Sequence, residues 1–331
     1  MHAVLPTADV AVASLCAVTE GSRRAVLAAM VANAGIAIAK FVGFLITRSA
    51  GMLAESVHSV ADTSNQALLL LGGKRAEREA DSQHPFGYGR ERYFWSFVVA
   101  LVIFTLGGLF ALYEGIEKMR SPHEIESVAW AIGILSVAMV AEAFSLRTAV
   151  RESAHAKGDQ GWWHFVRHSK SPELPVVLLE DIGAMFGLAL ALAGVVVARI
   201  TGNPRFDAAG SIAIGVLLVT IAVILVIEMK SLLIGEGASP ATETKITDTM
   251  QSTTSVTHVI HLRTQHLGPE ELLVGAKLAF DDQLDVAGLA AAINDVETRV
   301  RAAVPEARVI YIEPDLARSA PAGPTAAAKT E

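Results

Sequence analysis

The chain has 331 residues, of which 52% are hydrophobic, and a formal net charge of −7. Its single cysteine, Cys16, excludes an intramolecular disulfide and a thiolate metal cluster within one chain. The negative charge is spread over the loops and the tail, and no basic stripe is interleaved with aromatic residues, so nucleic acid is excluded as a partner.

Residues 1–22 are rich in Ala and Val, but they carry Asp9 and Glu20 and lack a basic leader. This composition predicts a flexible N-terminus rather than a cleaved signal peptide. Long apolar segments follow, and a helix needs roughly 20 such residues to cross a hydrocarbon core of about 30 Å. We expect transmembrane helices near residues 25–46, 53–73, 93–116, 127–149, 176–199 and 208–234. They predict an all-α six-helix transmembrane domain over residues 23–235.

The connections between these segments differ in their positive charge. Five Lys or Arg residues lie in or beside each of the second-to-third and fourth-to-fifth connections, whereas the other connections have one or two. Positive residues stay on the cytoplasmic side far more often than they cross. The pattern therefore predicts that both termini face the cytoplasm, in agreement with an even number of spans.

The composition changes near Gly235, beyond which charges recur every few residues. We expect a helix at 240–252, strands at 257–265 and 272–280, a helix at 286–304 and a strand at 307–313. Gly268 and Pro269 supply the turn between the first two strands, and Asp285 caps the second helix. The order αββαβ predicts a small ferredoxin-like α+β cytoplasmic domain over 236–316. Residues 317–331, rich in Ala, Pro and Thr, are predicted to be disordered.

Ionisable residues inside the apolar segments are the candidates for chemistry, because a carboxylate at mid-membrane costs about 3 kcal/mol on insertion scales. His58 and Asp62 are four residues apart, hence one turn apart on one helix face. An imidazole nitrogen and a carboxylate oxygen can share a metal such as Zn²⁺, which takes four ligands of mixed type. We expect Glu180 and Asp181 of the fifth segment to complete the set from a facing helix.

The alternative is that His58 and Asp62 pair with each other, or with Asn65 and Lys40, as ordinary buried polar groups. Carboxylates in two spans, together with a histidine, would add about 10 kcal/mol of insertion cost unless cations or protons occupy the site. This cost favours a functional cluster. Lys40, whose long stem can snorkel, and Glu142 of the fourth segment fit either interpretation.

Several stretches resemble the cation diffusion facilitator family of metal transporters. Residues 53–65, LAESVHSVADTSN, are similar to the second helix of that family, and residues 84–92, HPFGYGRER, to its loop before the third helix. Residues 206–215 resemble the start of the sixth helix, and Arg263-Thr264-Gln265 in the tail also fits. The resemblance covers residues 22–315 in one register.

The resemblance implies a homodimeric antiporter in the lipid bilayer, not an enzyme and without a prosthetic group. It would export a divalent metal, usually Zn²⁺, from the cytoplasm against inward protons by alternating access. The ligands of the family fall on His58, Asp62 and Asp181, but Val177 stands where His or Asp is common. Glu180, about 100° around the helix from Asp181, would substitute only if the helix unwinds or rotates. Otherwise a water or a metal that prefers more oxygens, such as Mn²⁺, is expected.

Two further metal sites of the family keep only some of their ligands in this chain. The loop site would keep Asp81 and His84, with a tyrosine where a second histidine is often found, which predicts weak binding. In the tail, His261 and Glu313 fall at ligand positions, whereas Lys277 would repel a cation. We therefore expect the tail domain mainly to hold a dimer together.

His58 is the natural proton carrier of this hypothesis, because its unperturbed pKa near 6.5 lets protons and metal compete for one nitrogen. A non-transporting regulatory or scaffold protein with degenerate sites is the alternative function, favoured by the missing fourth ligand and opposed by the costly cluster. An organic-solute transporter is disfavoured, since paired broken helices are lacking. Composition and the lack of a targeting segment predict a bacterial inner membrane.

Overall fold

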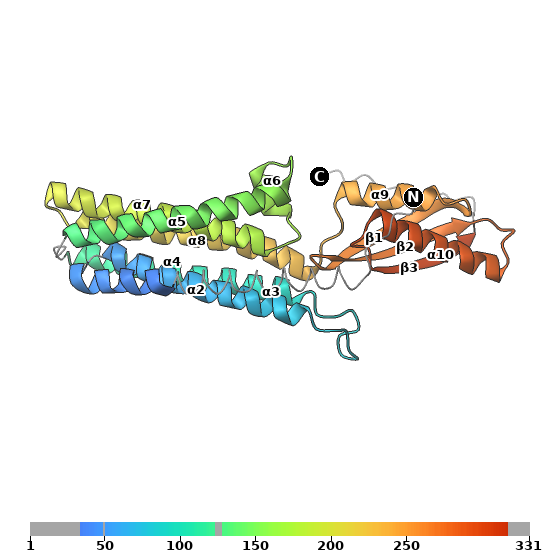
Figure 1. Ribbon diagram of the computed structural model, residues 1–331, viewed down its shortest axis with the longest axis horizontal. Coiled ribbons are helices and arrows are strands. Elements are labelled where there is room, and N and C mark those ends of the chain that lie inside the picture. Colours follow the sequence, from blue (N-terminus) through green and yellow to red (C-terminus); the bar gives the residue numbers. More distant parts are fainter. Residues whose placement is uncertain (1–33, 49, 123–127, 317–331) are drawn as a thin grey trace, which may run out of the picture. The chain divides into compact units, whose positions relative to one another are not determined.

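The computed structural model describes residues 34–48, 50–122 and 128–316 (Figure 1). The predicted flexible N-terminus and the predicted disordered tail lie outside these residues. The chain forms two compact units. The helical unit comprises Met1–Arg78 with Glu91–Lys230, and the C-terminal unit comprises Glu79–Arg90 with Ser231–Glu331.

Helices of different lengths make up the described part of the helical unit. They are an apolar helix at Ala34–Thr47, α2 (Ala50–Ala76), α3 (Glu91–Val98), α4 (Thr105–Arg120), α5 (Val128–Lys157), α6 (Trp162–His168), α7 (Glu173–Thr201) and α8 (Arg205–Ile234). A π-helical segment, η1 (Val99–Phe104), joins α3 to α4. The fourth predicted span continues as helix beyond residue 149 to Lys157, because the helix outlasts the apolar stretch on which the prediction was based.

Four stretches of the described chain are long and apolar enough to cross a membrane: Glu91–Arg120, Val128–Lys157, Glu173–Thr201 and Arg205–Ile234. They bear out a membrane protein with several apolar helices. The helix α2 is nearly as long, but polar side chains such as Glu55 and Asp62 make it less apolar. The first predicted span is described only over Ala34–Thr47. The total of six spans therefore stays a prediction.

Glycines bring α4 and α8 into close contact. A Cβ added to Gly215 of α8 would lie 2.8 Å from the carbonyl oxygen of Gly108 in α4, closer than such atoms approach. Nearby, the Ser211 hydroxyl donates to the carbonyl oxygen of Ala111 across the same interface, at 3.0 Å. Lipid offers no hydrophobic drive to pair helices, so close packing and hydrogen bonds of this kind hold them together.

The C-terminal unit has the predicted order αββαβ. Its elements are α9 (Pro240–Gln251), β1 (Val256–Gly268), β2 (Glu271–Phe280), α10 (Val286–Ala303) and β3 (Val309–Leu316). The strands form one mixed sheet in the order β1-β2-β3, in which β1 and β2 are antiparallel and β2 and β3 are parallel. The helix α10 makes the crossover that a parallel pair requires. Prediction placed the last strand at 307–313, but Ala307 donates its N–H to a turn and the strand begins at Val309.

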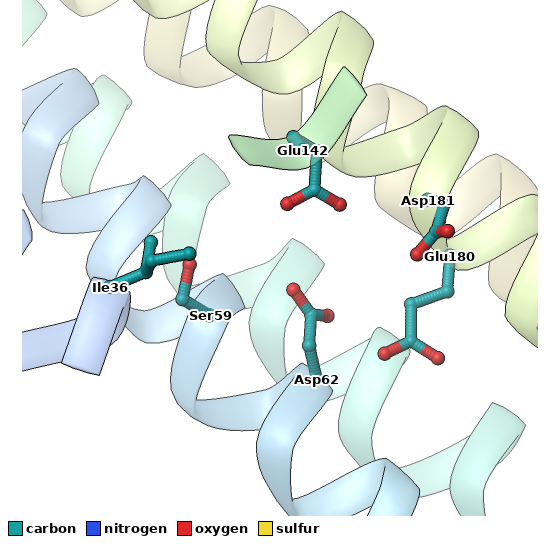
Figure 2. Close-up of a pocket in the computed structure, with 6 residues that line it drawn as sticks. All are labelled: Ile36, Ser59, Asp62, Glu142, Glu180 and Asp181. Carbon is teal, nitrogen blue, oxygen red and sulfur yellow. The ribbon is translucent and has the colours of Figure 1, made fainter. Parts of the chain in front are cut away.

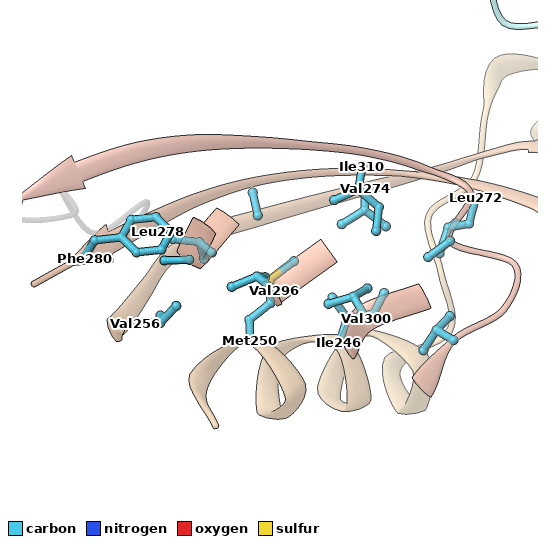
Figure 3. Close-up of a cluster of buried hydrophobic side chains, with 14 residues drawn as sticks. Ile246, Met250, Val256, Leu272, Val274, Leu278, Phe280, Val296, Val300 and Ile310 are labelled. Carbon is cyan, nitrogen blue, oxygen red and sulfur yellow. The ribbon is translucent and has the colours of Figure 1, made fainter. Parts of the chain in front are cut away.

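Alternate residues of β2 point into the core of this unit. Leu272, Val274 and Leu278 are fully buried and meet Ile246 of α9 and Val296 of α10 (Figure 3). The period of two along the strand thus supplies one apolar face, and both helices cover it. The predicted cap of α10 is confirmed, because the Asp285 carboxylate accepts a 2.7 Å hydrogen bond from the Gly288 N–H.

Replacing the cap tests how much it stabilises α10. We expect Asp285→Ala to destabilise the C-terminal unit by about 1 kcal/mol, because the first turn loses an acceptor for its free N–H groups. Asp285→Ser should keep most of this stability. Hydrogen–deuterium exchange of the first turn of α10 in the full chain would measure it, with Asp282→Ala as the exposed control. Equal exchange in Asp285→Ala and Asp282→Ala would refute the role of the cap.

Candidate functional site

A cavity in the helical unit gathers carboxylates from three helices (Figure 2). The helix α5 provides one of them, and α2 and α7 provide the others. Its lining residues are Ile36, Ser59, Asp62, Glu142, Glu180 and Asp181. Four acidic side chains therefore converge on one space within a largely apolar helical unit.

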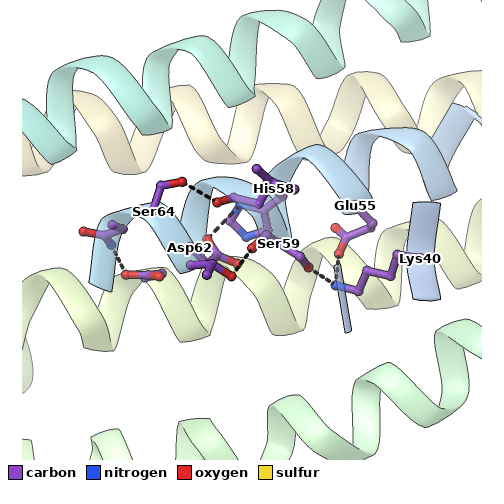
Figure 4. Close-up of polar contacts among 10 residues, drawn as sticks. Lys40, Glu55, His58, Ser59, Asp62 and Ser64 are labelled. Atoms are coloured by element: carbon purple, nitrogen blue, oxygen red, sulfur yellow. Dashed lines mark hydrogen bonds and ion pairs between the residues drawn. The ribbon is translucent and has the colours of Figure 1, made fainter. Parts of the chain in front are cut away.

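The predicted pair on α2 is in contact. The Nδ1 atom of His58 lies 3.4 Å from Oδ1 of Asp62, as the four-residue spacing predicts (Figure 4). His58 is 2% exposed, and its Nε2 atom meets no hydrogen-bond partner among the described residues. Asp62 lines the cavity, and His58 reaches it through Asp62. One imidazole nitrogen is thus held beside a carboxylate, while the other has no protein partner in the described part of the chain.

Both acidic residues of α7 line the cavity without any break in the helix. The helix α7 is α-helical from Glu173 to Thr201, and the expectation that Glu180 substitutes for a ligand only if the helix unwinds or rotates stays a prediction. The side chain of Asn65 on α2 donates to Glu180, and the Ser145 hydroxyl on α5 donates to Oδ2 of Asp181 at 3.0 Å. Neutral donors from the two flanking helices therefore orient these carboxylates.

A buried ion pair lies beside the cavity. The Nζ atom of Lys40 is 3.2 Å from Oε2 of Glu55 and donates to Oγ of Ser59 at 2.7 Å (Figure 4). Lys40 is 1% exposed and Glu55 is fully buried, so the lysine does not snorkel. Gly187 of α7 makes room for the pair, since a Cβ there would clash with the Glu55 carboxylate. Ser59 joins this pair to the cavity, which it also lines.

The structure brings together part of the predicted ligand set. Asp62, Glu180 and Asp181 share the cavity, and His58 contacts Asp62. Among the described residues, however, no group of three or more His, Cys, Asp or Glu side chains is close enough to hold a metal ion. A metal bound here would have to draw the side chains together.

Sequence reasoning left Glu142 undecided, although it lines the cavity. It lies alone in its apolar segment, so spacing within one helix gave no partner for it. The insertion cost applied to the carboxylates of the second and fifth segments applies to Glu142 as well. This insertion cost is the signal in the sequence that favours including Glu142 in the candidate site.

The predicted loop site has its oxygens engaged in local structure. Oδ1 of Asp81 accepts from the backbone N–H groups of Gln83 and His84, and Oδ2 accepts from the Tyr88 hydroxyl at 2.7 Å. The Tyr88 hydrogen bond, followed by the backbone bond from His84, lowers the pKa of the Asp81 carboxyl. The His84 and Tyr88 rings lie 4.4 Å apart. This geometry favours a structural role for Asp81.

The predicted tail site contains a positively charged side chain, Lys277. Nζ of Lys277 on β2 lies 2.7 Å from Oε1 of Glu313 and 3.1 Å from Oδ2 of Asp315, both on β3. These hydrogen bonds raise the pKa of the Lys277 ammonium. His261 is the residue of β1 that pairs with Lys277. An ammonium group therefore lies between the two predicted ligands, His261 and Glu313, along the row across the sheet.

Comparison with known proteins gives an independent line of information. Residues 26–234 match the family model of the cation efflux transmembrane domain. The human "Proton-coupled zinc antiporter SLC30A9, mitochondrial" is 32% identical over 268 residues, which are 80% of this chain and 47% of the relative. The Arabidopsis thaliana "Metal tolerance protein C4" is 30% identical over 80% of this chain and 58% of its own length. The Cupriavidus metallidurans "Metal cation efflux system protein CzcD" is 27% identical, covering 59% and 56%. The chain spans about half the length of these relatives.

Removing one partner of the buried Lys40–Glu55 pair tests how much the pair contributes to stability. We expect Lys40→Met to lower stability by about 3 kcal/mol, because Glu55 is left as an uncompensated buried charge. The double variant Lys40→Met/Glu55→Gln should recover most of the loss. Thermal unfolding in detergent measures both, with Lys74→Met at the exposed end of α2 as control. An unfolding temperature for Lys40→Met equal to that of the control would contradict this view.

The lowered pKa of Asp81 predicts how the order of its loop depends on pH. The stabilisation is complete above the ordinary pKa of 3.8 and is lost as the pH falls through the lowered value. Hydrogen–deuterium exchange of residues 81–88, corrected for intrinsic rates, should therefore accelerate below the ordinary value. In Tyr88→Phe, which removes the strongest hydrogen bond, exchange should already be faster above the ordinary value, and its acceleration below that value should be smaller. An identical pH profile in the variant would show that Tyr88 does not hold the carboxylate.

Proposed function

The chain belongs to the cation diffusion facilitator family, and we propose that it exports divalent metal cations from the cytoplasm in exchange for protons. The observation that carries the proposal is the cavity in which Asp62, Glu180 and Asp181 converge within apolar helices. Carboxylates inside membrane helices are costly and characteristically line ion or proton paths. A resident prosthetic group plays no part, since the metal is the cargo.

The proposal includes an arrangement of the chain in the membrane. The predicted first span, described over Ala34–Thr47, and α2 add two spans to the four apolar ones, with both termini in the cytoplasm. Residues 23–235 then form the transport domain and residues 236–316 a cytoplasmic domain that holds two copies together as a homodimer. The five basic residues in or beside each predicted cytoplasmic connection support this orientation.

In the proposed cycle, metal and protons compete for the same side chains. A divalent cation arriving from the cytoplasm draws Asp62, Glu180 and Asp181 together and displaces the hydrogen bonds from Asn65 and Ser145. His58, in contact with Asp62, gives up its proton when the metal binds. In the outward-facing state protons return to these groups and the metal leaves. Competition for one set of donors couples the two fluxes.

Zn²⁺ is the first cargo that we propose, and Mn²⁺ the second. The human relative is named as a proton-coupled zinc antiporter, whereas the carboxylates of this cavity also suit cations that prefer oxygen. The same name places that relative in mitochondria, so the comparison gives no support to the predicted bacterial inner membrane. The proposal therefore specifies a membrane without specifying the compartment.

Metal flux into sealed proteoliposomes tests the function. We expect uptake of Zn²⁺, and to a lesser extent Mn²⁺, that depends on a pH gradient. Asp181→Ala should reduce it at least about tenfold, because even outer partners of metal ligands contribute 10- to 100-fold to affinity. Asp159→Ala, at an exposed position, is the matched control and should transport normally.

Two outcomes would contradict the proposal. Flux that survives in both His58→Ala and Asp62→Ala would refute the proposed proton and metal competition. No flux with either metal, together with no bound metal after purification, would instead favour a non-transporting regulatory protein.

A further inference from the structure

The position of Glu142 ties a third helix to the proposed transport site. The helix α5 contributes Glu142 to the cavity, opposite Asp62 of α2 and beside Asp181 of α7. Figure 2 shows the carboxylates of Glu142 and Asp62 turned towards each other across the space between their helices. Neither the spacing of residues within a single helix nor the names of the relatives assigns this side chain a role.

The register of α5 places Glu142 at the cavity. Ser145 follows Glu142 by three residues, so both side chains lie on one helix face. Ser145 donates to Asp181, which fixes this face of α5 against α7. By contrast, the large apolar neighbours Val140 and Phe144 are exposed on the surface of the unit. Glu142 therefore belongs to the polar face that the site requires, and not to the surface that would meet lipid.

The carboxylates of the cavity come from four residues. Val177 of α7 packs against an apolar cluster that includes Phe165 and Leu178, so it contributes no donor to the cavity. The two carboxylates of α7 and Asp62 of α2 then supply three of the four acidic groups, and Glu142 supplies the fourth.

We propose that Glu142 is a direct ligand of the transported cation and that its carboxylate widens the selectivity of the site towards oxygen-preferring divalent cations such as Mn²⁺. The inference rests on the proposed function, because it concerns a ligand of the same transport site. Carboxylates and water suit Mn²⁺, whereas Zn²⁺ accepts imidazole as readily as oxygen. A site with four carboxylates beside one histidine therefore binds Mn²⁺ largely through its acidic groups. Zn²⁺ depends less on any single one of them.

Direct binding of metal to the purified full chain tests this assignment independently of flux. Equilibrium dialysis in detergent with Mn²⁺ alone, and with Zn²⁺ alone, gives the affinity of each metal. We expect Glu142→Gln, which preserves shape but removes charge, to weaken Mn²⁺ binding at least about tenfold and Zn²⁺ binding by less. Glu142→Ala should weaken both further. Glu152→Gln, an exposed position on the same helix, is the matched control and should bind as the unmodified chain does. Equal thermal unfolding of the two Gln variants shows that the fold is kept.

The outcomes separate this inference from the proposed function. If both Glu142 variants bind the two metals as Glu152→Gln does, while Asp181→Ala loses them, Glu142 is not a ligand and the transport proposal stands. If Glu142→Gln weakens both metals equally, the selectivity role is overturned. If the unmodified chain neither binds nor transports either metal, the proposed function fails first.

Discussion

Four carboxylates share one cavity in an apolar helix bundle, and the free-energy cost of that arrangement constrains the rest of the helical unit. Each carboxylate costs about 3 kcal/mol to place at mid-membrane, and like charges 4 Å apart add about 4 kcal/mol at an effective dielectric constant near 20. The nearby cation, Lys40, is already engaged by Glu55. The cavity is therefore stable when cations or protons offset its charge, which is the condition that an exchanger needs.

Some contacts between the surrounding helices are fixed, whereas others can be exchanged when a metal binds. Glycines and the Ser211 hydroxyl fix α8 against α4, and the buried Lys40–Glu55 pair ties the first described helix to α2. Between them, α7 packs against both α2 and α5, and it carries the two adjacent acidic residues. Its contacts with these helices at the cavity are hydrogen bonds from neutral side chains. Hydrogen bonds to charged groups contribute about 1.5–3 kcal/mol each, and these bonds can be exchanged for metal ligation. The fixed interfaces thus join α4 to α8 and the first described helix to α2, whereas the exchangeable ones join α7 to α2 and α5.

Sequence analysis succeeded where the governing interaction is local. Helical spacing predicted the contact of His58 with Asp62, and the cap of α10 at Asp285 follows from its own first turn. It failed to decide the roles of Lys40 and Glu142, because their partners lie on other helices and no spacing encodes them. The angle of Glu180 on its helix made its part in the ligand set conditional on unwinding or rotation, and in the structure Glu180 lines the cavity from a regular α7. The angular position of a residue around its helix fixes the direction of its Cα atom. The length of its side chain and the packing of the neighbouring helices decide whether it lines a cavity.

The three candidate sites differ in what already satisfies their carboxylates. In the tail, the Lys277 ammonium is bonded to the Glu313 carboxylate, so both partners are charged and a metal would have to displace a cation. In the loop, Asp81 accepts three hydrogen bonds that also shape the backbone, so a metal would have to dismantle the loop to bind. In the cavity, by contrast, the donors to Glu180 and Asp181 are one amide and one hydroxyl, both neutral and both on side chains that can rotate away. A divalent cation gains most where it replaces the weakest partners, and of these three sites that is the cavity.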